Sequence, residues 1–232
     1  MEAAGHRKAG PLSKTINFNW AGLTRPVNVM LCFAPPLPHA DEELGTWQNY
    51  VVWKVIHARP GEEGGSETVT IPGELAVAEH DMSGGDILTA STRIHMQEKQ
   101  KIVLNVKEDG FAEWGKPEAD PSLGKLFKVY NRTQSAHNIS VGTVCAKGDG
   151  HSAIYEPSFL WKEVGPNMAV RVSFKPILQA YFNMGFKVAE FFTEDVTDDL
   201  QWSQDVNTLP EHSDFDIIET PQHGYEIKAS SA

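Results

Sequence analysis

The sequence predicts an all-β protein, an antiparallel β-sandwich of the immunoglobulin-like or jelly-roll type. Apolar residues alternate with polar or small ones along many segments, most clearly at 168–175, where every second residue from Met168 to Phe174 is apolar. A period of two is typical of a strand with one buried face. The period of an amphipathic helix is almost absent between Thr15 and Lys175. Turn-forming residues separate the alternating runs at spacings that favour a sandwich or barrel.

The chain has 232 residues, of which 41% are hydrophobic, and this is enough for a well-buried core. We expect a flexible tail at 1–14, a β-sandwich domain at 15–193 and an acidic C-terminal segment at 194–232 that docks in part on the domain. A weak boundary near 115–124 leaves two smaller sandwiches as an alternative.

The first predicted strands lie near the N-terminus. Ile16, Phe18 and Trp20 form one apolar row, and every second residue of 27–33 forms another, which ends at the proline-rich run 34–38. The third strand, 47–57, is apolar on both faces, which is typical of a central strand or of one exposed apolar face.

Further strands follow along the middle of the chain. A strand pair is predicted around Pro72 and Gly73, and 87–96 and 101–106 read as a hairpin joined by the polar residues 97–100. The remaining strands are predicted at 126–131, 138–145, 153–164 and 168–175.

The pattern is ambiguous after Pro176. Residues 177–192 fit either a strand pair broken at Met184 and Gly185 or a short helix. The acidic end retains apolar residues such as Trp202, Phe215 and Ile217, which is too many for a purely solvating tail. We therefore expect part of it to dock.

The net charge of −11 is concentrated at the C-terminus, where 194–232 hold ten acidic residues and one basic residue, Lys228. We expect no basic face on this acidic chain and therefore no nucleic-acid partner, because phosphate contacts need lysine and arginine. No apolar run approaches the ~20 residues of a membrane helix. The N-terminus lacks the apolar centre of a secretion signal, which predicts a cytoplasmic protein. Cys32 and Cys145 are then expected to be free thiols.

No motif for a cofactor or a nucleophilic elbow is present. Imidazole stands beside carboxylate at 79–81 and at 211–214, a pairing that can bind a divalent ion, but polar loops collect such residues by default. We therefore predict neither a metal nor a cofactor.

The aromatic residues are the best functional lead. Trp47, Asn49, Trp53 and His57 are expected on one side of a single strand, where exposed indole rings can stack on a sugar or line an apolar groove. The alternative is that these rings pack in the core. The leading hypothesis is a non-catalytic binding protein, lectin-like or specific for a small apolar ligand, that forms a homodimer through a sheet face.

Two other classes stay open. One is an enzyme whose histidine and carboxylate site is assembled from loops, using His57, His80, His137 or His151. The other is a β-type membrane-acting or pore-forming protein, for which the charged segment 87–106 is the only candidate hairpin.

Overall fold

The computed structural model describes residues 13–34, 48–61, 63–81, 89–108, 110–146, 153–192, 200–220 and 224–231. Strands are the dominant secondary structure of this part of the chain, and its only helical segments are two short 3₁₀ turns, η1 (Pro121–Leu123) and η3 (Val206–Thr208). The prediction of an all-β protein is thus confirmed. No helix among the described residues has the length and apolarity needed to cross a bilayer.

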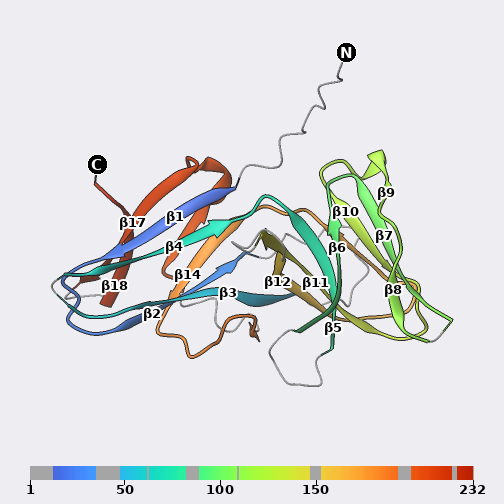
Figure 1. Ribbon diagram of the computed structural model, residues 1–232, viewed down its shortest axis with the longest axis horizontal. Helices are drawn as coiled ribbons and strands as arrows, with labels where there is room; N and C mark the ends of the chain where they lie inside the picture. The colour runs from blue at the N-terminus through green and yellow to red at the C-terminus, as the bar shows by residue number, and fades with distance from the viewer. Residues whose placement is uncertain are drawn as a thin grey trace, which may run out of the picture.

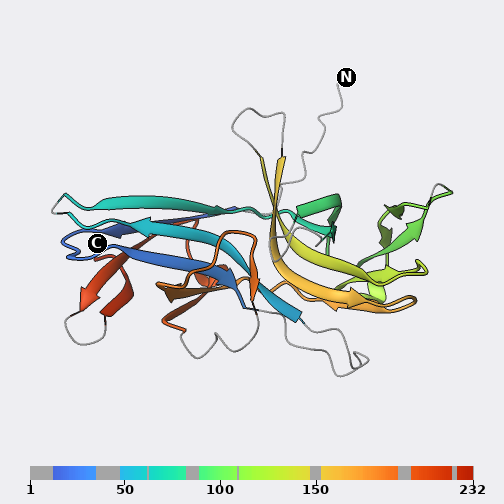
Figure 2. The ribbon, with the colours of Figure 1, turned by 90° about the horizontal axis from the view of Figure 1, so that it is seen from below.

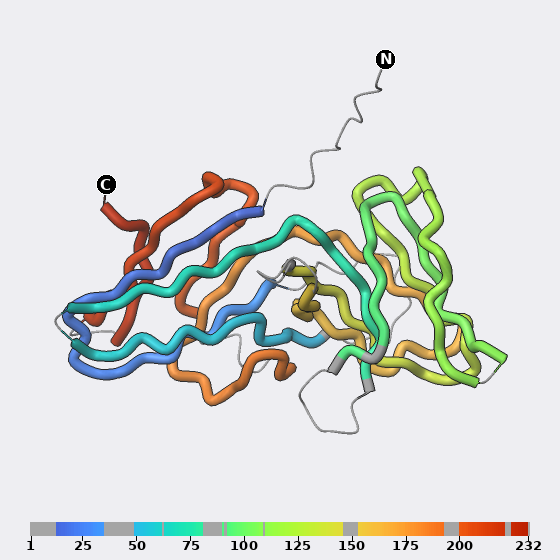
Figure 3. Tube along the Cα trace, viewed as in Figure 1, coloured from blue at the N-terminus to red at the C-terminus, as the bar shows by residue number. Residues whose placement is uncertain are grey.

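A four-stranded sheet lies at one end of the molecule (Figure 1). Its order is β18-β17-β1-β4, formed by β1 (Lys14–Trp20), β4 (Gly65–Ile71), β17 (His212–Thr220) and β18 (Gly224–Ala229). The first described strand, β1, pairs in parallel with β17, so segments far apart in the sequence run side by side (Figure 3).

A five-stranded sheet lies at the opposite end (Figure 1). It follows the order β13-β10-β7-β8, with β9 also paired to β7. Its strands are β7 (Gln100–Val106), β8 (Ala112–Trp114), β9 (Glu118–Ala119), β10 (Phe127–Asn131) and β13 (Ala169–Val172).

A nine-stranded, strongly curved sheet connects the two ends (Figure 2). Its order is β16-β14-β2-β3-β12-β11-β5-β6, with β15 paired to β3. Its strands are β2 (Val27–Phe33), β3 (Gln48–Ala58), β5 (Leu75–Asp81), β6 (Thr89–Met96), β11 (His137–Ala146), β12 (Ala153–Val164), β14 (Ile177–Phe182), β15 (Phe191–Phe192) and β16 (Trp202–Asp205).

The three sheets form two lobes. In the first lobe the four-stranded sheet covers β2 and β3, and in the second the five-stranded sheet packs with β11 and β12. The chain enters the second lobe through 72–74 and returns through 173–176, so the second lobe is an insertion within the first. One apolar cluster runs through both lobes, and Phe174 links them by contacting Phe33 at 5.6 Å and Phe159 at 5.9 Å between ring centroids.

One predicted pairing differs in the structure. The segments around 87–106 do form strands, but β6 pairs with β5 in the nine-stranded sheet while β7 joins the five-stranded sheet. The hairpin prediction is therefore wrong, because the polar turn with Lys99 in the left-handed region (φ 61°) carries the chain from one layer to the other. The ambiguous segment 177–192 forms the strands β14 and β15.

A bulge in β3 changes which side chains share a face. Leu31 pairs with Lys54 but Cys32 pairs with Val52, so Trp53 is an extra residue on β3. As a result Trp53 and Ile56, three residues apart, both pack in the main core. Val52 packs on the other face, in a second apolar cluster. This bulge breaks the simple alternation that the sequence predicts for 47–57.

Candidate functional site

A groove of about 960 Å³ lies where the two lobes meet. Half-buried Leu75, Phe174, Pro72 and Pro176 contribute apolar surface to it. The charged and imidazole side chains of the groove are Lys14, Glu74, His95, Glu98, Lys99 and Lys125.

The position of the groove follows from the chain connections. Both crossings between the lobes, 72–74 and 173–176, contribute to its lining. The turn between β6 and β7 forms another wall, and it is held by a hydrogen bond from the backbone N–H of Lys99 to the carbonyl of Leu126 (2.7 Å). This bond places Lys99 close to Lys125 on the same wall.

The charged rim is incompletely neutralised. Lys14 Nζ donates to the backbone carbonyl of Leu209 over 2.6 Å, which satisfies a donor but leaves the charge. His95 Nδ1 lies 3.6 Å from Glu74 Oε2, and both side chains are more than half exposed. Within the described part of the chain, Lys99 and Lys125 form no side-chain ion pair. The rim therefore offers two exposed ammonium groups beside an apolar floor.

Of the four residues predicted from the aromatic pattern, the three that the structure describes do not share one exposed surface. Trp47 lies outside the described residues. Trp53 is 1% exposed and packs on Phe33 at 5.1 Å between ring centroids, and Asn49 is 6% exposed. His57 is exposed on the other face of β3, where Nδ1 lies 2.8 Å from Asn28 Oδ1. The bulge at Trp53 separates it from His57.

Trp53 belongs to a polar cluster around Glu156. Its indole N–H donates to Oε2 over 2.8 Å, and the Lys54 ammonium contacts Oε1. Cys145 Sγ donates to Oε2 over 3.5 Å. Burial, with the adjacent carboxylate, raises the pKa of the Cys145 thiol to about 11. Burial alone raises the pKa of the Cys32 thiol, and by more than that of Cys145. Neither thiol is therefore prepared for nucleophilic chemistry at neutral pH.

A second polar chain crosses β5, β11 and β12. His80 Nε2 lies 2.5 Å from Ser140 Oγ, and Ser140 Oγ lies 2.6 Å from Tyr155 Oη. Burial raises the pKa of Tyr155, so its hydroxyl stays protonated. An imidazole beside a serine can activate a nucleophile, but Ser140 is fully buried and does not line the groove. The arrangement favours a structural role.

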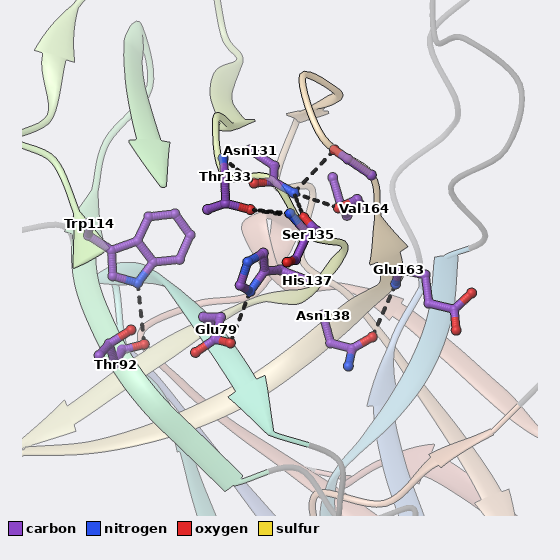
Figure 4. A network of polar contacts seen from close by, with 11 residues as sticks. Glu79, Thr92, Trp114, Asn131, Thr133, Ser135, His137, Asn138, Glu163 and Val164 are labelled. Atoms are coloured by element: carbon purple, nitrogen blue, oxygen red, sulfur yellow. Dashed lines mark hydrogen bonds and ion pairs between the residues drawn. The ribbon is translucent and has the colours of Figure 1, made fainter. Parts of the chain in front are cut away.

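The third network surrounds Asn131, which is fully buried (Figure 4). Its amide nitrogen donates to the carbonyls of Ser135 (2.8 Å) and Val164 (2.7 Å), and this ties the turn after β10 to the end of β12. Nearby, His137 Nδ1 lies 3.2 Å from Glu79 Oε1 (Figure 4). These two side chains also lie outside the groove lining.

On β5, a histidine and an acidic residue that are adjacent in the sequence point to opposite faces of the strand, so they do not act as a pair. Glu79 and His80 are neighbours on β5 and contact different partners, His137 and Ser140. Within the described ranges no three histidine, cysteine or acidic side chains gather as a metal site. His151, one of the histidines considered for catalysis, lies outside those ranges.

Sequence reasoning missed the groove because its lining comes from six short segments spread between Lys14 and Asn207. The one local signal for it is at Pro72 and Gly73, around which the sequence predicts a strand pair. No protein-family model, no curated protein and no solved structure matches this chain.

Proposed function

We propose that the protein binds, without transforming it, a small ligand with an apolar body and an anionic head group, held in the groove between the lobes. The observation that carries this proposal is the groove itself, with an apolar floor and exposed ammonium groups at its rim.

Size and place support the proposal. Sites for small ligands are usually clefts of ~300–1,000 Å³ with mostly apolar walls and a few polar groups, and they occur preferentially where domains meet. The groove has a volume of about 960 Å³ and lies between the lobes. Leu75 and Phe174 supply apolar surface from either side of the crossing.

Charge supports the anionic head group. Lys99 and Lys125 share one wall, and Lys14 lies at the start of β1. Glu74 is already next to His95. A carboxylate or sulfonate placed between Lys99 and Lys125 would gain charge-assisted hydrogen bonds, which are stronger than neutral ones.

The other candidate functions have weaker support. Carbohydrate stacking would depend on Trp47, whose surroundings are not described, because Trp53 is buried. A histidine and carboxylate enzyme would need His80 or His137 to face a cavity, and neither lines the groove. A membrane hairpin from 87–106 would have to break β6 and β7 out of two different sheets.

We also infer that each lobe is a two-layer sandwich and that the acidic end is an integral part of the first lobe. The parallel pairing of β17 with β1 and the pairing of β16 with β14 support this inference. The sandwich matters for binding because rigid layers keep the groove open before the ligand arrives.

Octanoate is the probe, and its binding is measured by saturation-transfer NMR. Octanol, which has no charge, serves as the neutral counterpart. We expect octanoate to bind more tightly than octanol. Lys99→Glu with Lys125→Glu should weaken octanoate binding by about tenfold or more, equivalent to ~1.4 kcal/mol. Asn207→Trp, which adds bulk at an exposed position of the lining, should block both probes.

Two matched controls keep the test specific. Lys116→Glu introduces the same kind of charge change at an exposed residue outside the lining, and Ser203→Trp introduces the same bulk on β16. Both should bind octanoate as the wild type does. Normal binding by the Asn207→Trp variant would place the site elsewhere, and equal affinity for octanoate and octanol would refute the anionic head group.

A further inference from the structure

The outward face of the five-stranded sheet gathers positive charge. Phe127 and Val129 of β10 are buried, so Lys128 and Tyr130 between and after them point outward. Lys128 lies opposite Lys101 on β7 and opposite Arg171 on β13. A row of three cations therefore crosses three adjacent strands, although the chain as a whole is acidic.

This row is electrostatically unfavourable within one molecule. Like charges that face each other across strands are destabilising. Glu118 lies 3.4 Å from Lys101 and offsets part of the repulsion. Asp120 is also close: its pKa is lowered first by the hydrogen bond from Ser122 and further by Lys101 and Lys128. Among the described residues, Lys128 and its neighbour Arg132 form no ion pair, so positive charge remains on this face beside these two acids.

An aromatic surface lies beside the cations. Lys128 Nζ is 4.2 Å from the centroid of the Tyr130 ring, and the Arg132 guanidinium is 5.7 Å from it. Val103 and Ala169 flank Tyr130 on the neighbouring strands. We call Lys101, Lys128, Tyr130, Arg132 and Arg171 the basic face. It suits a partner that combines carboxylates with an apolar side chain.

The four-stranded sheet carries such a surface. Phe215 and Ile217 of β17 are buried, so Asp214, Asp216 and Ile218 form its outward row, and Ile218 is 37% exposed. Asp214 accepts a hydrogen bond from Asn17 and Asp216 accepts one from Ser230, both neutral donors.

The nearest cation does not neutralise this row. Lys228 lies opposite Asp216 but contacts Glu226 at 2.6 Å. Among the described residues, Asp214 and Asp216 have no ion pair. We call Asp214, Asp216, Ile218 and Glu226 the acidic face.

From these two faces we propose that copies of this chain associate head to tail, with the basic face of one copy on the acidic face of the next. The two sheets lie at opposite ends of the long axis (Figure 1), so one copy cannot satisfy its own faces. The contact uses two different surfaces and is therefore heterologous, which gives rings or open chains rather than a symmetric dimer. The basic face corrects the expectation that the chain lacks one, since its residues are dispersed in the sequence.

The test is a charge swap read by sedimentation velocity on the full chain. At about 20 mM salt and about 0.1 mM protein the wild type should form species larger than a monomer, which dissociate at about 1 M salt, where screening acts over ~3 Å. Lys128→Glu with Arg171→Glu should be monomeric, and so should Asp214→Lys with Asp216→Lys. An equimolar mixture of the two variants should associate again, because each then presents the charge that the other lacks.

Controls separate the contact from general effects. Lys116→Glu with Lys187→Glu changes the net charge equally at exposed residues outside the basic face and should associate as the wild type does. All variants should melt within a few degrees of the wild type, since every altered side chain points outward. A monomeric wild type at low salt would overturn the proposal, as would a mixture that stays monomeric. Binding of a single-stranded oligonucleotide by a monomeric wild type, lost in Lys128→Glu with Arg171→Glu, would instead assign the face to nucleic acid.

Discussion

Phe127 on β10 and Val172 on β13 lie directly opposite each other across the five-stranded sheet, and both are almost completely buried. The next pair in the register, Lys128 and Arg171, points to the other side. One step along each strand therefore separates the core from the solvent, as the period of two requires.

This alternation predicts opposite outcomes for two neighbouring substitutions. Val172→Asp should unfold the protein or lower its free energy of unfolding by several kcal/mol, because it places an unpaired charge in the core. Arg171→Asp should change that free energy by about 0.5 kcal/mol or less, since the residue faces outward beside Lys128. Urea denaturation measures both values. Equal losses for the two variants would mean that the assignment of faces is wrong.

Glu156 predicts a second, local effect on stability. Its side chain is 13% exposed. The carboxylate accepts hydrogen bonds from Trp53 and Lys54 of β3 and from Cys145 of β11. Removing one partner of a buried ion pair costs ~3–5 kcal/mol, and the partial exposure of Lys54 reduces this. We expect Glu156→Gln to lower the free energy of unfolding by about 1–3 kcal/mol.

A surface ion pair provides the control for Glu156. Glu226 contacts Lys228, and the Lys228 side chain is 59% exposed. Exposed pairs contribute ~0–1 kcal/mol, so Glu226→Gln should have little effect in the same denaturation experiment. A loss for Glu226→Gln as large as that for Glu156→Gln would refute the role given to burial.

Much of the fold could be predicted from period-two rows, and the failures have identifiable physical causes. The predicted rows at 27–33 and 101–106 form β2 and β7 because their apolar side chains face one core. Strand pairing was less predictable. A polar turn such as 97–100 can either close a hairpin or carry the chain to the opposite layer, and only the distant partners β5 and β10 decide between them.

The candidate site was harder to predict than the strands. An extra residue at Trp53 reverses the faces of β3, and no turn residue or glycine marks it in the sequence. Lys14 of the first lobe joins Lys99 and Lys125 of the second lobe around one groove only when the lobes are assembled. Local patterns therefore report burial well, but they do not report which exposed side chains converge.

Cysteine reactivity gives a prediction about pH. Burial and Glu156 raise the pKa of Cys145 to about 11 from a reference value of 9.0. At pH 8 the thiolate fraction of the folded protein should then be about 100-fold below that of the unfolded chain, and alkylation correspondingly slow. Iodoacetamide labelling followed by mass spectrometry measures this, with two free thiols expected in denaturant.

The same pKa shift has a consequence for stability. A thiol whose pKa is higher in the folded state favours folding below the unfolded pKa, and this contribution is lost as the pH rises from about 9 to about 11. Cys145→Ala should reduce the loss of stability over this pH window. Fast labelling of Cys145 in the folded protein at pH 8 would contradict the burial of its thiol.

The acidic end yields the last prediction. Phe215 of β17 lies 6.1 Å from Phe18 and 5.1 Å from Trp202 between ring centroids, so strands from both ends of the chain share this aromatic group. Removal of 194–232 would uncover β1 along its full pairing with β17. We expect the truncated chain to be insoluble or to melt far below the intact protein, because each large apolar side chain returned to water costs ~1.5–3 kcal/mol.

A milder variant tests the same packing when the truncated chain does not fold. Phe215→Ala should lower the free energy of unfolding by about 3–5 kcal/mol, the usual cost of a buried phenylalanine. Ile218→Ala, at an outward position of the same strand that is 37% exposed, should lower it by less than about 1 kcal/mol. Thermal and urea unfolding compare the two. Two results together would contradict this role: a soluble truncated chain with the melting temperature of the intact protein, and a Phe215→Ala effect no larger than that of Ile218→Ala. The acidic end would then not stabilise the first lobe. It would then act as a solubilising or partner-binding tail.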